Sequence, residues 1–424
     1  MIFSFFGAGE KDKAFTYLNF RRFMFSKFMM TLALQIQFVA LNWQVYQFTH
    51  DELSLGLLGL FEAIPAVGLA LFGGYYSDHH DRRRILVIVM ALQTLLAASV
   101  LGISMYYESK SGITTALPFY IVMFIVGVLR AFYGPAQFPL MTQLVPREAY
   151  ANSSAWNSTF WHIGVVVGSA CGGLMLGFLG ATVTYTSVIL MLLIAFIQVV
   201  RIPPQAATKP EKTEGMADSI SKGVKFVFSN QMIFGAMLLD LIAVLFGGAT
   251  AMLPVFAGEI LHVGEKGFGF LRAAPFIGSV VMALYMTRRP PMKNAGKKLL
   301  LCVTGFSLCM IAFALSRNFF LTMAILALSG AFDNVSVVIR STIMQFFTPD
   351  DMRGRVASVS TMFVSSSNEI GAFESGAAAK IFGLIPSVIG GGVIAILSVG
   401  ASGIWLPKLR QLDMEKEHRA EQEG

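Results

Sequence analysis

The sequence predicts an all-α membrane protein, with twelve transmembrane helices in two pseudo-symmetric six-helix bundles. Hydrophobic residues make up 55% of the 424 residues and charged residues only 13%, which is far more apolar than a soluble domain. Uncharged stretches long enough to cross a hydrocarbon core of about 30 Å recur along the chain. The two halves also share a spacing of glycine and proline residues.

Breaks of proline, glycine and charge mark the ends of the predicted helices. In order these are 24–49, 53–76, 84–107, 115–144, 149–177, 180–201, 230–257, 264–286, 296–316, 318–346, 352–383 and 386–406. The Pro- and Lys-rich break after the sixth helix ends in an amphipathic segment, 218–228. The expected domains are therefore a bundle over 1–201, a cytosolic linker over 202–229, and a bundle with a short cytosolic tail over 230–424.

Charge predicts the orientation of these helices. If the N-terminus is cytosolic, 24 of the 32 Lys and Arg residues fall in cytosolic segments and only Lys110, Lys266 and Arg317 in external loops. This bias is typical of a multi-pass protein with both termini in the cytosol. Membrane topology explains the scattered basic residues better than a nucleic-acid partner does, so none is expected.

Cysteine usage argues against a disulfide framework or a metal centre. Cys171, Cys302 and Cys309 all lie inside apolar runs and have no metal-ligand spacing. No cofactor is expected.

The two halves of the chain repeat each other. A shift of 210 residues aligns Pro65 with Pro275, and a shift of 203 aligns Gly168 with Gly371. Parallel repeats of this kind are a common architecture of secondary transporters.

Charged residues nevertheless occur inside the predicted spans. The basic ones are Lys27, Arg130, Arg272, Arg340 and Lys380, and the acidic ones are Glu62, Asp240, Asp333, Glu369 and Glu374. Ionised groups at bilayer depth are costly unless they are paired or hydrated, so they should face the protein interior or a cavity. Their formal charges cancel, as internal pairing requires.

The turn after the second helix reads GGYYSDHHDRRR, with Gly74 four residues before Asp78 and a basic cluster behind it. In this twelve-helix context the motif resembles the loop signature of the major facilitator superfamily. Over nearly its whole length the chain is most similar to bacterial exporters of the enterobactin-exporter and multidrug-efflux type.

The resemblance implies a cytosolic latch between the two halves. Gly74 would let the second helix approach the eleventh closely, and Asp78 would meet the positive N-terminal end of that helix. The residues assigned to this latch are Gly74, Asp78, Asp81, Arg82, Arg83, Arg353 and Arg355. The alternative is a plain positive-inside loop with solvated charges. A metal site at the adjacent His and Asp residues is disfavoured, because neighbouring residues on a turn rarely converge.

A small-residue strip in the fifth helix resembles the antiporter signature of the superfamily. Gly164, Gly168, Gly172 and Gly173 line one side of the helix, and Ser169 stands where the signature has proline. We expect this strip to pack tightly against the other half. Generic small-residue packing is the alternative.

Arg130 and Gly134 in the fourth helix resemble an Arg-x-x-x-Gly element that drug–proton antiporters carry, where the arginine is linked to proton coupling. The alternative is that Arg130 is only a structural partner of a buried acid. Under both interpretations Arg130 requires a counter-ion. We expect Asp333 to be its partner, because the fourth and tenth helices face each other in this fold. Arg340, two turns from Asp333 on the same face, is the competing partner of that carboxylate.

Proton coupling requires a carboxylate that gains and loses its proton near neutral pH. Asp240 and Asp333 are the first candidates, and Glu62, Glu369 and Glu374 are the second. Glu62 and Glu374 are expected at similar depths on neighbouring helices, where they would share a proton. The charge partners expected in the cavity are Arg130, Arg272 and Arg340.

These observations together predict a monomeric secondary active transporter of a bacterial inner membrane. It would export small amphiphilic compounds, such as drugs or siderophores, by alternating access driven by the proton gradient. A lipid or lysolipid transporter, or an uptake transporter of the same superfamily, is the alternative. An intramembrane enzyme is disfavoured because the chain carries no converging nucleophile and base or metal motif.

Overall fold

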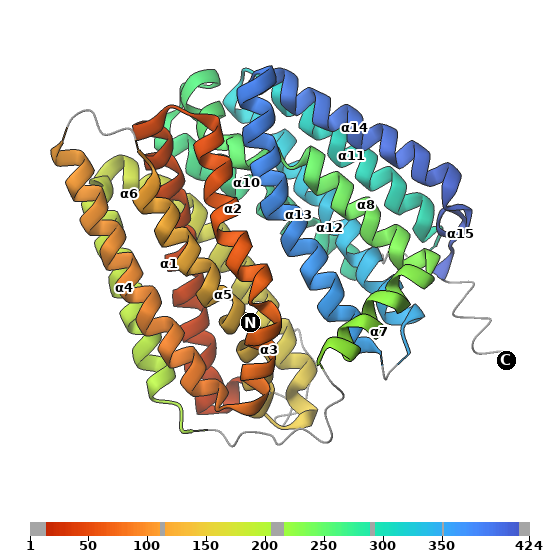
Figure 1. Ribbon diagram of the computed structural model, residues 1–424, viewed down its shortest axis with the longest axis horizontal. Coiled ribbons are helices and arrows are strands. Elements are labelled where there is room, and N and C mark those ends of the chain that lie inside the picture. The colour runs from red at the N-terminus through yellow and green to blue at the C-terminus, as the bar shows by residue number, and fades with distance from the viewer. Residues whose placement is uncertain (1–13, 111–114, 205–215, 289–292, 350–351, 415–424) are drawn as a thin grey trace. The chain divides into compact units, whose positions relative to one another are not determined.

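The structure is a computed structural model that describes residues 14–110, 115–204, 216–288, 293–349 and 352–414. Most of these residues are helical, and no strand occurs among them. Contacts divide the chain into two compact units (Figure 1). Unit 1 comprises Met1–Gln44 and Ile64–Glu211, and unit 2 comprises Val45–Ala63 and Lys212–Gly424. The ends of the first two helices that adjoin their connecting loop therefore belong to unit 2, although they precede the linker in sequence.

The helices of the first half begin with η3 and end with the long α6. They are η3 (Ala14–Thr16), α1 (Leu18–Thr49), α2 (Glu52–Gly68), α3 (Ala70–His79), α4 (Arg82–Ser109), α5 (Leu117–Gln143), η4 (Arg147–Ala149) and α6 (Tyr150–Val200). Within unit 1, α4 packs against both α5 and α6, and α3 packs against α5. Helix α6 bends at Gly180, whose φ of 76° is readily adopted only by glycine.

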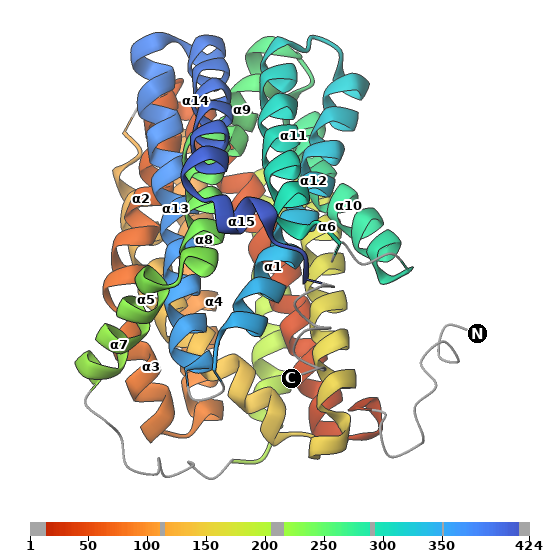
Figure 2. The ribbon, with the colours of Figure 1, turned by 90° about the vertical axis from the view of Figure 1, so that its right-hand side faces the viewer.

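The second half begins with the amphipathic α7. Its elements are α7 (Met216–Ser229), α8 (Gln231–Gly247), η5 (Ala249–Met252), α9 (Leu253–Val255), the π-helix η6 (Phe256–Ile260), α10 (Gly264–Arg288), α11 (Ala295–Leu315), α12 (Phe319–Phe347), α13 (Arg353–Phe382), α14 (Leu384–Trp405) and α15 (Pro407–Gln411). Helix α14 runs beside α11 and α8 (Figure 1). Helix α7 packs against α13, and α15 turns across the end of α14 (Figure 2).

The helical fold class predicted from sequence is confirmed. Among the described residues, nine helices are long and apolar enough to cross a membrane. The bend at Gly180 divides α6 into the predicted fifth and sixth spans, and α2 with α3 forms the predicted second. Helix α13 is the remaining span of the predicted twelve. Its serines and charges lower its hydropathy, and it packs against α8 and α14.

Each unit contains a similar close crossing between two of its helices. A side-chain carbon built at Gly73 on α3 would lie 2.0 Å from the carbonyl oxygen of Ala131 on α5. In unit 2, a side-chain carbon built at Gly278 on α10 would lie 1.7 Å from the carbonyl oxygen of Ala327 on α12. Both positions therefore require glycine, because any side chain would collide with the facing carbonyl oxygen. Small residues of this kind allow membrane helices to approach closely. The pair relates the second and fourth helices of each repeat in the same way.

Candidate functional site

A buried ion pair joins two helices of unit 2. The guanidinium of Arg340 on α12 forms a salt bridge with the carboxylate of Asp240 on α8. Only 10% and 8% of the two side chains are exposed. Arg340 also uses its Nε to donate a hydrogen bond of 3.4 Å to the carbonyl oxygen of Ser336. Because each charge neutralises the other, both are tolerated at this depth.

Asp333 lies near this pair along the same helix. It precedes Arg340 by seven residues, which places it on the same face of α12 and about 10 Å away along the axis. The bond from Arg340 to Ser336 directs the guanidinium toward the N-terminal end of α12, where Asp333 lies. Among the described residues, the half-buried Asp333 makes no side-chain hydrogen bond or ion pair. Arg340 is thus bonded to one carboxylate, Asp240, and has a second carboxylate, Asp333, within two helical turns.

The crossing of α2 and α13 positions the remaining acidic residues. A side-chain carbon at Gly56 would lie 3.0 Å from the carbonyl oxygen of Ala372, and one at Gly376 would lie 2.8 Å from that of Glu52. These contacts define an antiparallel register between the two helices.

This register corrects the expectation that Glu62 and Glu374 share a depth. In the register, Glu374 lies near the level of Ser54, so Glu62 is eight residues, or about 12 Å, further along α2. Gly59 instead lies beside Glu369, whose Oε2 would be 3.4 Å from a carbon built at that glycine. Glu62 and Glu369 are therefore closer in depth than Glu62 and Glu374. The charge of Glu369 also acts on the guanidinium of Arg272 on α10.

Two polar contacts that sequence reasoning missed connect residues 45–63 to the rest of unit 2. The hydroxyl of Tyr46 donates a hydrogen bond of 2.8 Å to Glu259 in the π-helix η6. Gly258 makes this possible, because a carbon built there would lie 2.9 Å from the Tyr46 ring. A local sequence pattern carries no signal for this contact or for the second one, described next, since the partners in each are hundreds of residues apart.

The second contact joins Lys380 to Asp51 in the loop between α1 and α2. The Lys380 ammonium lies 2.7 Å from Oδ1 of Asp51. Partial burial by itself raises the pKa of Asp51, but hydrogen bonds from Lys380 and Ser54 and the charge of Lys380 lower it overall. Lys380 was expected inside a span. It lies instead in the last turn of α13, and 52% of its side chain is exposed.

Unit 1 has a different set of buried polar groups. Lys27 on α1 is 6% exposed and donates a hydrogen bond to the amide oxygen of Asn157 on α6. Gln44 donates to Ser104 at 2.7 Å and accepts from Tyr185 at 2.8 Å. Arg130 on α5 is exposed on the protein surface of this unit. Because Arg130 lies in unit 1 and Asp333 in unit 2, their pairing stays a prediction.

The glycine strip of the fifth predicted helix packs within its own unit, which corrects the expected partner. Carbons built at Gly164, Gly168 and Gly172 would lie 2.8–3.0 Å from side chains of α1, those of Thr31, Gln35 and Val39. Gly173, the last member of the strip, is buried. The strip therefore lets α1 and α6 approach closely, because no side chain separates them.

Part of the charged turn after α3 has local structural roles. Asp81 caps α4 by accepting a hydrogen bond of 3.0 Å from the backbone N–H of Arg83. The Arg83 guanidinium donates to the carbonyl oxygen of Val200 at 2.5 Å, and Arg22 donates to that of Arg201 at 2.9 Å. These arginines satisfy carbonyl groups left open at the end of α6.

The remaining residues assigned to the latch are described only in part. Nothing lies within 4 Å of a carbon built at Gly74. Arg355 contacts the sulfur of Met352 at 3.2 Å, and Arg82 is half-buried. The side chains of Asp78 and Arg353 lie outside the described part of the chain, so the latch stays a prediction. No group of three or more His, Cys, Asp or Glu residues suited to a metal ion occurs in the described ranges.

Comparisons with known proteins agree with this architecture. A family model described as "transmembrane secretion effector" matches residues 14–423. The multidrug efflux pump Tap of Mycolicibacterium fortuitum is 26% identical over 403 residues, covering 89% of this chain and 93% of Tap. The enterobactin exporter EntS of Escherichia coli is 24% identical over 365 residues, covering 84% of both chains.

Solved structures share the fold at low sequence identity. The POT family transporter PepTSo matches with a TM-score of 0.70 and 10% identity, covering 93% of this chain and 99% of its own. A bacterial homologue of the human lysosomal transporter Spinster, solved inward-facing and unoccupied, matches with a TM-score of 0.66 and 13% identity, covering 96% and 99%. The chain therefore belongs to the transmembrane secretion effector family of the major facilitator superfamily, and is a multi-pass membrane transporter rather than an enzyme.

Proposed function

We propose that this transporter exports small amphiphilic compounds, of the drug or siderophore class, in exchange for protons. The named activities of Tap and EntS support the direction and the class of substrate. The protein would work by alternating access in a bacterial inner membrane, with both termini in the cytosol and the turn containing Asp78 as a cytosolic latch. The basic residues concentrated in the predicted cytosolic segments support this orientation.

The observation that carries proton coupling is the buried Asp240–Arg340 pair with Asp333 nearby on the face of Arg340. Protonation of Asp240 would remove the charge that holds Arg340, leaving the guanidinium free to turn toward Asp333. Loss of the proton would restore the original pair. A buried arginine exchanged between two carboxylates links proton binding to a rearrangement of α8 against α12, because a charge left unpaired at this depth is costly.

Proteoliposomes with an imposed pH gradient test this proposal. We expect Asp240→Asn to abolish gradient-driven movement of an amphiphilic dye while leaving downhill exchange of the dye measurable. Asp333→Asn should also impair the gradient-driven reaction, since Arg340 would lose its second partner. Glu148→Gln, which removes an exposed carboxylate outside the spans, is the matched control. Gradient-driven transport that both asparagine variants retain in full would refute the coupling role.

Direction needs a second measurement, because the same fold serves uptake as well. Labelling one face of the protein identifies liposomes in which all copies share one orientation. These liposomes should accumulate dye only when the gradient drives the dye from the α7 side of the membrane to the opposite side. Accumulation in the opposite sense would favour an uptake transporter. Movement of a fluorescent lysolipid in preference to the dye would favour a lipid transporter.

A further inference from the structure

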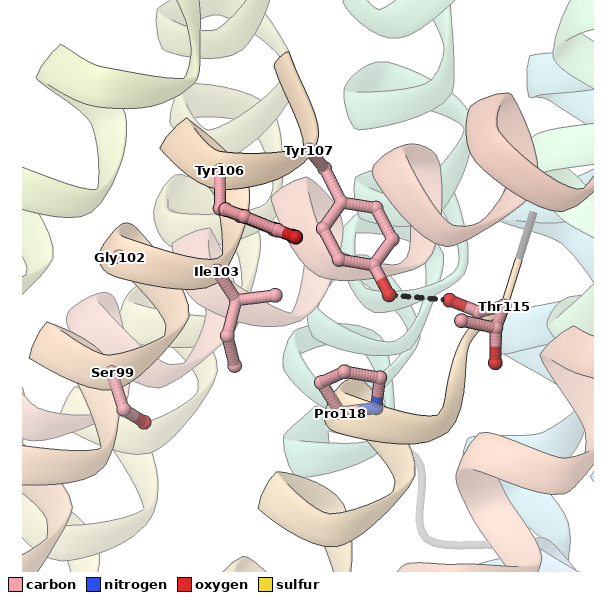
Figure 3. Close-up of a pocket in the computed structure, with 7 residues that line it drawn as sticks. All are labelled: Ser99, Gly102, Ile103, Tyr106, Tyr107, Thr115 and Pro118. Atoms are coloured by element: carbon pink, nitrogen blue, oxygen red, sulfur yellow. Dashed lines mark hydrogen bonds between the residues drawn. The ribbon is translucent and has the colours of Figure 1, made fainter. Parts of the chain in front are cut away.

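Unit 1 contains an open groove between α4 and the beginning of α5, with a cavity volume of about 630 Å³ (Figure 3). Ser99, Gly102, Ile103 and Tyr106 line it from α4, and Pro118 lines it from α5. At one end, the hydroxyl of Tyr107 donates a hydrogen bond of 2.6 Å to the carbonyl oxygen of Thr115. The groove is mostly apolar and belongs entirely to unit 1.

The groove interrupts an exposed stripe along α4. Leu92, Leu95, Ser99, Gly102 and Tyr106 are all exposed and recur every three or four residues, so they share one face of the helix. An exposed apolar face on a transmembrane helix faces acyl chains. Ser99 and Gly102 are the small residues of this stripe, and nothing lies within 4 Å of a carbon built at Gly102. The stripe therefore has a notch where the groove lies.

A cation lies just beyond the groove. The ammonium of Lys110 donates a hydrogen bond of 3.1 Å to the hydroxyl of Tyr106 and lies 4.8 Å from the centre of its ring. Lysine and tyrosine at the end of a membrane helix are typical of the headgroup level. From Ser99 to Lys110 the helix rises about 16 Å, which is close to one leaflet of a core of about 30 Å.

We propose that this groove binds one phospholipid with an anionic headgroup. The phosphate would lie against the Lys110 ammonium and the Tyr106 hydroxyl, and an acyl chain would lie in the notch at Gly102 and Ser99. The rise of α4 from Ser99 to Lys110 matches the length of an acyl chain within one leaflet, and the positive charge of Lys110 beyond the groove selects a net negative lipid. The lipid is distinct from the transported compound, because none of the mid-span charges of unit 2 lines the groove.

Native mass spectrometry of the purified full-length protein, titrated with dioleoyl phosphatidylglycerol or dioleoyl phosphatidylcholine, tests the charge preference. We expect the unmodified protein to retain one phosphatidylglycerol more strongly than phosphatidylcholine. Lys110→Gln should weaken phosphatidylglycerol retention about fivefold, the effect of about one lysine at a membrane surface, without changing phosphatidylcholine retention. Lys266→Gln, which removes another predicted external cation, should leave both lipids unaffected.

Filling the notch tests the position of the acyl chain. Gly102→Phe should abolish retention of both lipids, whereas Gly400→Phe should not. Gly400 is the matched control because it too is an exposed helical glycine with nothing within 4 Å of its built carbon, and it lies on α14. Circular dichroism checks that each variant is folded, and Ser99→Phe replaces Gly102→Phe if the latter is not.

Three results would overturn the proposal. One is lipid retention by the filled groove equal to that of the Gly400 variant. Another is an unchanged lipid preference in Lys110→Gln. The third is displacement of phosphatidylglycerol by a cationic dye at equal concentration, which would make the groove a site for amphiphilic cations instead.

Discussion

The two units differ in how they neutralise buried charge. Of the ten charged residues named above inside the predicted spans, unit 1 holds only Lys27 and Arg130, both basic. Unit 2 holds the other eight, including all five carboxylates, because Glu62 belongs to it through the packing of residues 45–63. The formal charges of these ten residues cancel when both units are taken together, but not within either unit.

The difference favours unit 2 as the location of the proposed proton coupling. In unit 1 the buried Lys27 is held by Asn157, a neutral partner that cannot titrate. In unit 2 the buried Arg340 is held by Asp240, whose charge depends on its proton. Of these two arrangements, only the second would link proton binding to a change of side-chain partner, so we place the proposed coupling in unit 2.

Removing the buried cation of each unit gives the largest expected effect and tests the comparison directly. Arg340→Met leaves Asp240 buried and unpaired, which should lower the free energy of unfolding by about 3–5 kcal/mol. Lys27→Met leaves only the neutral Asn157, so the loss should be about 1–3 kcal/mol. Denaturant unfolding in detergent micelles measures both. The double variant Asp240→Asn with Arg340→Met should recover much of the larger loss, and equal losses in the two single variants would contradict the distinction.

The shared helix crossing predicts a similar effect in both units. Gly73→Val and Gly278→Val each force a side chain into a facing carbonyl group, so each should lower the free energy of unfolding by about 1–3 kcal/mol or more. Gly400→Val, which has open space, is the control. Thermal unfolding followed by circular dichroism measures the loss. If only one of the two variants were destabilised, the crossings would not be equivalent.

A smaller effect is expected at the charged turn of unit 1. Arg83→Ala removes the hydrogen bond to Val200 at the end of α6, and should lower the free energy of unfolding by about 1 kcal/mol. Arg84→Ala is the neighbouring control, because 77% of the Arg84 side chain is exposed. Thermal unfolding that does not distinguish the two variants would mean that Arg83 acts only as an orientation signal.

The smallest effect is a pH dependence at the Asp51–Lys380 pair of unit 2. Because the pKa of Asp51 is lowered in the folded protein, its contribution to stability is present above the unfolded value of about 3.9 and is lost as the pH falls through the folded value. The contribution should stay below about 1 kcal/mol, since water screens the pair and 52% of the Lys380 side chain is exposed. The Tm difference between the unmodified protein and Asp51→Asn should therefore be present at pH 6 and vanish in strong acid. A difference that grows on acidification would reverse the assigned sign.

Helix positions were well predicted from the sequence because each span is an apolar run bounded by charge, proline or glycine. The predicted helix 318–346 differs from the observed α12, Phe319–Phe347, by one residue at each end, and the predicted amphipathic segment 218–228 lies within α7. The predicted break between the fifth and sixth spans coincides with the bend at Gly180. A single predicted helix, 53–76, is interrupted at Leu69 in the structure, four residues after Pro65.

The partners of individual side chains were predicted less well. The Gly164 strip packs on α1 rather than on the other half, and Glu62 is closer in depth to Glu369 than to Glu374. Arg340 was considered as a partner for Asp333, yet it binds Asp240. Helical periodicity assigns each residue to a face, but it does not tell which of several neighbouring helices that face contacts, or in what register.

By itself, the sequence determined that the chain is a helical membrane protein with ionisable groups inside its spans. The hydrocarbon core requires about 20 apolar residues per helix, and this requirement is readable along the chain. Only the tertiary structure decided that Asp240 holds Arg340, that Asn157 holds Lys27, and that Tyr46 reaches Glu259. Such pairs depend on the rotation and depth of separate helices, which are set by close packing at a few glycine contacts rather than by any local pattern.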